Sequence, residues 1–234
     1  MDVLNRPAIK FEARNFISID RRWLAIFLAG IVPFLIDSCK VTIRLYVERN
    51  TDNYSDIFLG NPLILNFAWL LPLVSWLISP IAIALCGYRL NCLRNNKFDS
   101  KYVYLTAGLN YTKFLITEIV RAVLIILWSL LLVVPGIIKG FAYSMTGFII
   151  CDNPTLASKD AINLSERITY GYKKDIFIMY LSFIPWYFLV SITLGLGSIY
   201  VTPYVGITEA MFYENLKKHA IETGVASPNE FGIY

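Results

Sequence analysis

Few side chains in this chain of 234 residues could carry out acid–base, nucleophilic or metal chemistry. The single histidine, His219, lies beside Lys217 and Lys218 in a polar stretch, which favours a solvated side chain over a catalytic one. The sequence has no metal-ligand spacing, no nucleophile elbow and no phosphate-binding glycine loop. We therefore expect no enzymatic activity and no catalytic residues, cofactor or metal.

Four charged side chains are of more interest because they fall within long apolar runs or at their ends: Glu118, Arg121, Asp152 and Glu209. A charge near the centre of a bilayer costs about 3 kcal/mol on insertion scales, so it needs a partner, a hydrated cavity or a route to the interface. Glu118 and Arg121 share a helix face, and they either pair with each other or form a substrate or ion site. Glu209 is either buried with a cationic partner or exposed at the interface.

Asp152 ends a short apolar run and is followed by Asn153 and Pro154. Asp or Asn as the N-cap, with Pro in the first turn, is typical of a helix start, and we expect a helix over 155–170 that is capped here. The alternative is that Asp152 binds a cation or a proton. With Glu118, Arg121 and Glu209 it would then surround an intramembrane polar site.

The composition indicates that these charges belong to a membrane protein. Apolar residues make up 56% of the chain, charged residues only 16%, and the mean hydropathy is +0.56. These values exclude a disordered chain, a collagen, a coiled coil and a small secreted scaffold. Four cysteines, Cys39, Cys86, Cys92 and Cys151, form no disulfide framework and are expected to be buried free thiols.

Six apolar segments predict an all-α integral membrane protein with about six transmembrane helices. They cover 23–46, 63–87, 115–134, 137–151, 176–194 and 196–213. A span needs about 20 residues to cross about 30 Å of hydrocarbon, so the fourth and sixth segments are short. Turns around Pro135 and Gly136, and around Gly195 and Gly197, should join the last four spans into two hairpins.

The basic residues predict the orientation. Segments 1–22, 88–114, 152–175 and 214–234 carry most of the 21 Lys and Arg residues, whereas the loop 47–62 is mainly acidic. The positive-inside rule then places both termini in the cytoplasm of a cell whose cytoplasmic membrane the chain crosses repeatedly. Although the net charge is +4, the basic residues form no groove or helix typical of a nucleic-acid-binding protein, so we expect no nucleic-acid partner.

The chain accordingly divides into three parts: a cytoplasmic amphipathic leader (1–22), a six-span membrane domain (23–213) and a cytoplasmic tail (214–234). Within the leader, Ile9, Ala13 and Phe16 or Ile17 recur at helical spacing, which predicts a short helix lying along the membrane surface.

Small residues mark the faces where spans could pack closely. They recur every four residues in the fourth and sixth spans, at Gly136, Gly140 and Ser144, and at Ser198, Thr202, Gly206 and Ala210. These stripes predict either packing against neighbouring helices of the same chain or a homo-oligomer interface.

The leading functional hypothesis is a non-enzymatic membrane protein whose basic cytoplasmic face engages anionic lipid or a partner protein. Four residues define this basic face: Lys159, Arg167, Lys173 and Lys174. One alternative is a small transporter or channel component that uses the intramembrane polar site. Another is an immunity or regulatory membrane protein, which fits the size of the chain.

Part of the sequence resembles a known bacterial membrane family. The matching segments are LWSLLLVVPGIIKGFAYSMTGFIICDNP, AINLSERITYGYKKDIFIMYLSF and TLGLGSIYVTPYVGITEAMFYENL, all within 127–216. They are similar to the family called domain of unknown function 975, and the leader with IKFEARNF and Trp23 resembles it more weakly. The stretch 50–113 matches little of it.

The resemblance implies a multi-spanning helical protein of the bacterial cytoplasmic membrane, with no established activity or catalytic residues. The family's Pro-Gly pair falls on Pro135 and Gly136, and its Asp-Asn-Pro on residues 152–154. Its Pro-Tyr pair falls on 203–204 and its Phe-Tyr pair on 212–213.

Overall fold

The computed structural model describes residues 4–30 and 62–233, and every regular element in these two ranges is a helix. The α-helices are α1 (Arg6–Ser18), α2 (Arg22–Ala29), α5 (Pro62–Asn95), α6 (Lys101–Leu109), α7 (Tyr111–Leu131), α8 (Val133–Ala142), α9 (Thr146–Asp152), α10 (Ser158–Ile168), α11 (Lys173–Leu181), α12 (Ile184–Ile192) and α13 (Ser198–Glu222). Two short 3₁₀ helices cover Ile19–Arg21 and Pro228–Phe231. The all-α prediction is confirmed for this part of the chain.

Within the described residues, three helical segments are long and apolar enough to cross a membrane. Tyr111–Leu131, Val133–Asp152 and Lys173–Ile192 correspond to the predicted third, fourth and fifth spans. The helix α13, where the sixth span is predicted, is not among them. Most of the first span, 23–46, and the loop 47–62 lie outside the described residues. Helix α5 covers the second span, but the side chains of 62–78 lie outside the described part.

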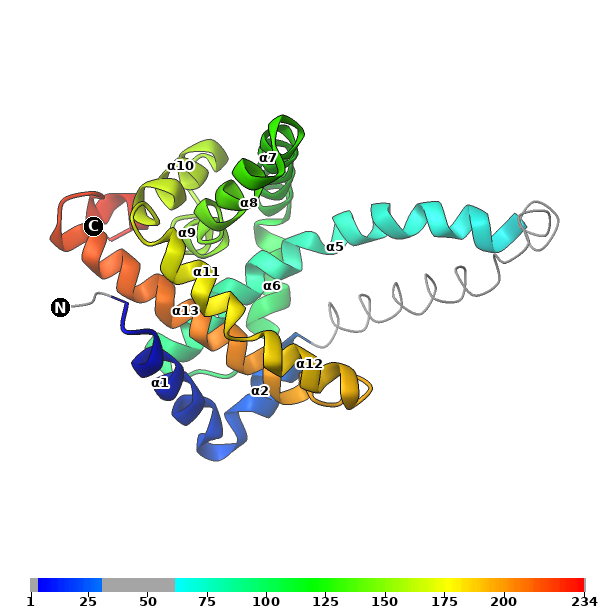
Figure 1. Cartoon of the computed structure of the whole chain (residues 1–234), viewed down its shortest axis with the longest axis horizontal. Helices are drawn as coiled ribbons and strands as arrows, with labels where there is room; N and C mark the ends of the chain where they lie inside the picture. The colour runs from blue at the N-terminus through cyan, green and yellow to red at the C-terminus, as the bar shows by residue number, and fades with distance from the viewer. Residues whose placement is uncertain (1–3, 31–61, 234) are drawn as a thin grey trace.

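The core of the molecule lies around α13, which runs beside α5 (Figure 1). Phe212 and Tyr213 of α13 and Tyr88 of α5 are completely buried. The Tyr213 ring stacks on Phe148 of α9, with ring centroids 5.3 Å apart. Figure 1 also shows the amino-terminal half of α5 projecting away from the other described helices, and both ends of the chain lying at the same end of the molecule.

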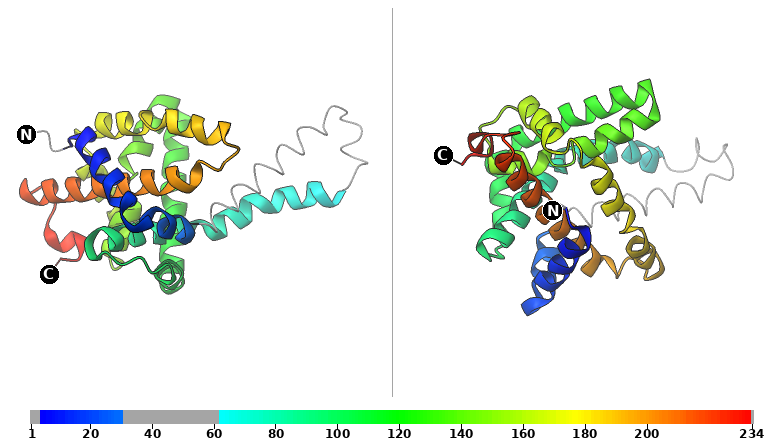
Figure 2. Two further views of the ribbon diagram at one scale, coloured as in Figure 1. Left: turned by 90° about the horizontal axis from the view of Figure 1, so that it is seen from below. Right: turned by 60° about the vertical axis from the view of Figure 1, so that its left-hand side comes forward.

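The α7–α8 pair does not run parallel to α5 and α13. Helix α7 is seen nearly end-on in Figure 1, whereas Figure 2 shows it along its length, with α7 and α8 side by side in the right-hand view. It therefore crosses α5 and α13 steeply. This arrangement determines which side chains of α8 lie near α10 and α11.

The leader helix α1 forms as its periodicity predicts. Asn5 caps it by accepting a hydrogen bond from the Ala8 N–H at 3.3 Å. Ile9 is 4% exposed, and Ala13 and Ile17 are completely buried, because this face packs on α13. The prediction that the face lies on the membrane surface is wrong for these three residues, since protein rather than lipid covers them.

The turn between α7 and α8 lies earlier than predicted. Only Leu132, with extended φ −161° and ψ 143°, separates the two helices. Pro135 and Gly136 already belong to the first turn and a half of α8, where the missing N–H of Pro disrupts no helical hydrogen bond. A Cβ on Gly136 would lie 2.9 Å from the Cα of Ser129, so Gly136 permits α7 and α8 to approach this closely.

The second hairpin turn is confirmed. Helix α12 ends at Ile192 and α13 begins at Ser198. Gly195 has φ +91°, a left-handed conformation that favours glycine. The Gly197 N–H donates to the Thr193 hydroxyl at 2.9 Å and closes the turn.

The two small-residue stripes are only partly packing faces. Gly136 contacts α7 closely, but a Cβ on Gly140 would meet nothing within 4 Å. Ser198 and Ala210 are buried, whereas Thr202 is exposed. At Gly206 a Cβ would overlap the Arg89 guanidinium of α5, so the absence of a side chain there leaves the space that Arg89 occupies.

The predicted cap of the 155–170 helix is wrong. The helix, α10, begins at Ser158 with Ala157 as its N-cap residue. Asn153 instead accepts the Thr155 N–H at 3.2 Å through its side-chain oxygen, which forms a local turn after α9. Asp152 binds side chains of distant helices, as described below, and so caps nothing here.

Candidate functional site: a polar cavity and a basic apolar groove

Glu209 of α13 is half-buried beside cationic and hydroxyl partners from two other helices. Its carboxylate lies 3.1 Å from the Arg89 guanidinium of α5 and accepts a hydrogen bond from the Tyr180 hydroxyl of α11 at 3.0 Å. Of the two alternatives that the sequence left open, the structure favours the first: Glu209 has a cationic partner and is partly buried. Gly206, one turn earlier, leaves the space that Arg89 occupies.

Glu118 and Arg121 form the expected pair on α7, with 2.6 Å between the Glu118 carboxylate and the Arg121 guanidinium. Arg121 and Glu209 also line a cavity of about 350 Å³, together with Cys86, Ile125, Gly140, Ser144, Phe148 and Tyr180. The cavity therefore brings two of the four predicted polar residues together. Its charges are compensated by ion pairs within the protein.

Asp152 belongs to a separate cluster at the carboxyl end of α9. We call it the Asp152 cluster; its members are Arg94, Asp152, Tyr213, Glu214 and Lys217. The Asp152 carboxylate binds the Arg94 guanidinium through two hydrogen bonds of 2.7 and 2.9 Å. It also accepts from the Tyr213 hydroxyl at 2.8 Å and from the Lys217 ammonium at 2.5 Å. The side chain of Asp152 is only 4% exposed.

The Asp152 cluster joins three helices, and the four hydrogen bonds to the Asp152 carboxylate all come from protein side chains. Arg94 also lies 2.6 Å from the Glu214 carboxylate of α13. Two positive and two negative charges are thus combined: the Asp152 and Lys217 side chains are buried, whereas those of Arg94 and Glu214 are 38% and 35% exposed. Asp152 does not line the 350 Å³ cavity.

Sequence reasoning missed the basic partners Arg89 and Arg94, which it assigned to an inner loop over 88–114. Helix α5 instead continues to Asn95 and carries both arginines toward α13. The signal that could have indicated this is the absence of any Gly or Pro after Gly87 that would end the helix before Asn95.

The four residues of the basic face differ in their surroundings. Arg167 of α10 is bound at 2.8 Å by the Glu230 carboxylate from the C-terminal tail. Lys159 and Lys174 are exposed and Lys173 is half-buried, and no ion pair involves any of these three lysines within the described residues. The free positive charge of this face therefore comes from the lysines.

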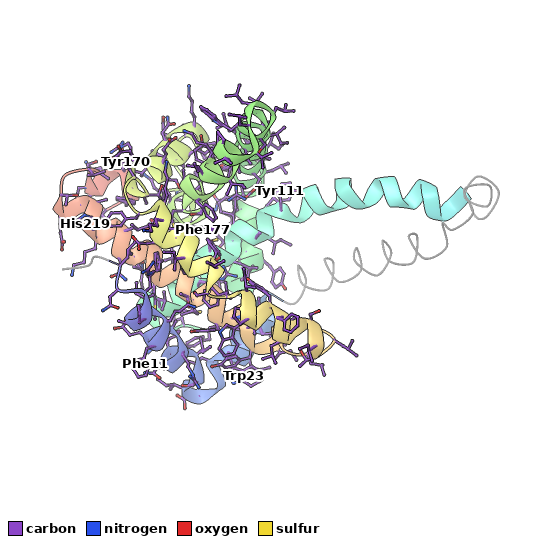
Figure 3. All side chains as sticks on the ribbon, in the orientation of Figure 1. Phe11, Trp23, Tyr111, Tyr170, Phe177 and His219 are labelled. Carbon is purple, nitrogen blue, oxygen red and sulfur yellow. The ribbon has the colours of Figure 1, made fainter. Side chains whose placement is uncertain are left out.

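Lys173 and Lys174 border an open groove between α8 and α11, with a volume of about 290 Å³. Its other lining residues are Val134, Ile137, Ile138, Phe141 and Phe177. Phe177 is 46% exposed on α11, and Figure 3 shows where it lies relative to Tyr170 and His219. We call this feature the lysine groove; its wall is almost wholly apolar.

The lysine groove joins segments that the sequence predicts on opposite sides of the membrane. Val134 lies beside the turn expected at the outer surface, and Lys173 and Lys174 end the segment expected at the inner surface. Lys139 of α8 also lies 2.5 Å from Glu166 of α10. The structure brings these segments together because α7 and α8 cross α5 and α13 steeply.

This proximity predicts a crosslink. In a chain whose native cysteines are replaced by Ser, Val134→Cys with Lys174→Cys should be joined by a short bismaleimide, as seen by altered mobility after protease cleavage between the two positions. Val134→Cys with Lys159→Cys is the control, since Lys159 does not line the groove. If positions 134 and 174 lay on opposite sides of the membrane, about 30 Å of hydrocarbon would separate them. The first pair would then form no crosslink.

The C-terminal tail packs against the protein rather than extending from it. Phe231 is 2% exposed, and the Asn153 side-chain amide donates to the backbone carbonyls of Asn229 and Glu230, both at 3.3 Å. His219, predicted to be solvated, is half-buried with its ring edge-on to Tyr172 at 5.6 Å. The tail thus covers the end of α10 and the Asp152–Asn153 backbone.

Acid is expected to release this tail. The hydrogen bonds from Arg167 hold the pKa of the Glu230 carboxyl below its usual 4.5. A lowered folded-state pKa means that the contribution is present above about pH 4.5 and is lost as pH falls through the folded-state pKa. The protection factors of the amides in 225–233, which are exchange rates corrected for the intrinsic effect of pH, should therefore stay high from pH 8 to 5 and fall below pH 4.5. In Glu230→Gln these protection factors should be low throughout; a pH response equal to wild type would contradict the role of Glu230.

The described residues hold no group of three or more His, Cys, Asp or Glu side chains that could bind a metal ion. Cys92 is buried, while Cys86 and Cys151 are partly buried, and all three are free thiols. Cys39 lies outside the described residues.

The comparison with protein families matches residues 31–220 to a model described as "Protein of unknown function (DUF975)". The chain belongs to the DUF975 family. No curated protein and no solved structure matches it. In this DUF975 member the family match includes the stretch 50–113, for which the sequence motifs indicated little similarity. The leader 1–22, for which they indicated a weak resemblance, lies outside the match.

Proposed function

We propose that this DUF975 member is a non-enzymatic, multi-spanning protein of the cytoplasmic membrane whose basic face binds anionic lipid. The observation that carries the proposal is a set of lysines that form no ion pair among the described residues, Lys159, Lys173 and Lys174, of which the last two border an exposed apolar groove. Each Lys near an anionic leaflet contributes about 1 kcal/mol of attraction. Arg167 is left out of this set because Glu230 already compensates its charge.

The proposed topology has both termini in the cytoplasm and about six spans. The distribution of Lys and Arg along the sequence supports it. The start of α1 and the C-terminal 3₁₀ helix Pro228–Phe231 lie at the same end of the molecule, which also supports an even number of crossings (Figure 1). Formation of the 134–174 crosslink, which the lysine groove predicts, would mean that the third and fourth segments do not cross the membrane fully, and would reduce the six spans to four; its absence would support six.

We propose that the protein is not an enzyme because its intramembrane carboxylates are held in ion pairs. Glu118, Asp152 and Glu209 are each bound by an arginine or lysine. A general acid or base needs access to a substrate proton, whereas these carboxylates are occupied by ion pairs. Their arrangement is suited to holding α5, α9, α11 and α13 together.

The test uses the full chain, since a free peptide of 153–175 would expose Arg167, which is paired in the protein. The protein is reconstituted in vesicles of equal phosphatidylglycerol and phosphatidylcholine, and spin-labelled forms of each lipid report association with its surface. We expect several-fold preference for phosphatidylglycerol, which falls to nearly none in Lys159→Gln/Lys173→Gln/Lys174→Gln. Arg167→Gln is the matched control and should keep the preference. An unchanged preference in the triple variant would remove the proposal.

The cavity lined by Arg121 and Glu209 supports a second candidate function, a small-solute transporter or channel component. Such a role requires that water and solutes reach the cavity from a membrane surface. With Cys39, Cys92 and Cys151 replaced by Ser, Cys86 in the cavity wall should then react with a small charged methanethiosulfonate reagent in intact vesicles. No reaction over hours would rule this function out.

A further inference from the structure

The lysine groove has two properties that together describe its ligand. Along its length it is apolar: Val134 is 66% exposed, Ile137 53% and Ile138 44%, and no other described side chain covers them. At one border lie Lys173 and Lys174, whose aliphatic stems can line the apolar wall while their ammonium groups stay polar. A complementary ligand is a long apolar chain that carries negative charge at one end.

The positive charge of these lysines is not neutralised by the nearest acidic residues. Asp175, the next residue along α11, lies 3.2 Å from the Arg6 guanidinium of the leader. Glu166 of α10 is bound by Lys139. Among the described residues no carboxylate pairs with Lys173 or Lys174, so the border of the groove keeps two positive charges for an external group.

We propose that the lysine groove binds one anionic phospholipid of the bilayer, with its phosphate on Lys173 and Lys174 and an acyl chain along Val134, Ile137 and Ile138. This inference rests on the proposed lipid-binding function and makes it specific to one site. A bilayer lipid fits better than a soluble ligand because the surface around the groove is also apolar. Leu130 and Leu131, for example, are 78% and 69% exposed on the adjoining end of α7.

The test counts lipids on the full-length protein by native mass spectrometry from a mild detergent, with phosphatidylglycerol or phosphatidylcholine of identical acyl chains. Wild type should retain one phosphatidylglycerol in preference to phosphatidylcholine. Lys173→Gln/Lys174→Gln should weaken phosphatidylglycerol binding about thirtyfold and weaken phosphatidylcholine binding much less, because the choline cation already cancels the charge of that lipid's phosphate. Ile138→Trp, which fills the groove and keeps both charges, should weaken both lipids. Phe177→Ala, which removes part of the wall, is a second groove variant in case the first fails to fold.

Lys159→Gln is the matched control, because this exposed lysine belongs to the basic face but does not line the groove. It should leave the retained lipid in place. Glycerol phosphate, which has the charged group without an acyl chain, should not displace the lipid. If it does, the apolar groove plays no part and the inference is overturned.

The remaining outcomes separate the site from the proposed function. Equal small losses from Lys159→Gln and from Lys173→Gln/Lys174→Gln, with no effect of the groove variants, would mean diffuse attraction to the basic face; the site would fail and the function would stand. Phosphatidylglycerol binding unchanged in all lysine variants would overturn both. A lipid-free dimer that Ile138→Trp dissociates would identify a second copy of the chain as the occupant and overturn the inference.

Discussion

Asp152→Asn is expected to lower the free energy of unfolding by about 3–5 kcal/mol, because it leaves the buried Lys217 ammonium without its carboxylate partner and removes one of the two carboxylates that bind Arg94. The side chain is 4% exposed and accepts four hydrogen bonds, so water cannot replace what is lost. Thermal unfolding of the detergent-solubilised protein should show a drop in Tm of roughly 10 °C.

Asp160→Asn is the matched control for this prediction. Asp160 lies exposed in the first turn of α10 and makes no ion pair among the described contacts, so its replacement should change stability by less than about 0.5 kcal/mol. Adding Lys217→Met to Asp152→Asn should restore part of the loss, since it removes the buried positive charge that Asp152 no longer compensates. Equal Tm values for Asp152→Asn and Asp160→Asn would show that the Asp152 cluster does not stabilise the fold.

Gly136→Ala is expected to destabilise the protein by about 1–3 kcal/mol through overpacking of α8 against α7. The new Cβ would lie 2.9 Å from the Cα of Ser129, and a backbone atom cannot move aside as the end of a flexible side chain can. The two helices would have to separate along the hairpin. Thermal unfolding in detergent measures the loss.

Gly140→Ala, one turn further along the same helix, provides the control. A Cβ on Gly140 meets nothing within 4 Å, so only helix propensity changes, and the variant should be more stable by about 0.5–1 kcal/mol. The spacing of small residues in the sequence makes Gly136 and Gly140 equivalent, whereas the structure predicts that their replacement by Ala changes the stability in opposite directions. Equal effects of the two substitutions would contradict the packing of Gly136 on Ser129.

Local patterns were sufficient to predict several elements. The apolar runs predicted the helical segments that became Tyr111–Leu131, Val133–Asp152 and Lys173–Ile192, within a few residues at each end. The spacing of Ile9, Ala13 and Ile17 predicted the buried face of α1. The pair of Glu118 and Arg121 followed from helical geometry alone, because residues three apart lie on one face.

The candidate site could be predicted only in part. The partner of Glu209 is Arg89, 120 residues earlier, and the partners of Asp152 come from α5 and α13. No local spacing indicates which distant cation a buried carboxylate meets. The lysine groove was missed for the same reason: its two walls come from α8 and α11, and the basic residues on their own indicated only a charged segment.

The sequence by itself determined the helical character of the chain, its affinity for an apolar medium and the positions of its charges along the helices. These follow from side-chain polarity and periodicity, which act over a few turns. Only the tertiary structure decided that α7 and α8 cross α5 and α13, that Asp152 and Glu209 are neutralised within the protein, and that Lys173 and Lys174 stay free beside an apolar groove. Those outcomes depend on contacts between segments far apart in the chain, where close packing, as at Gly136 and Gly206, selects one arrangement of the helices.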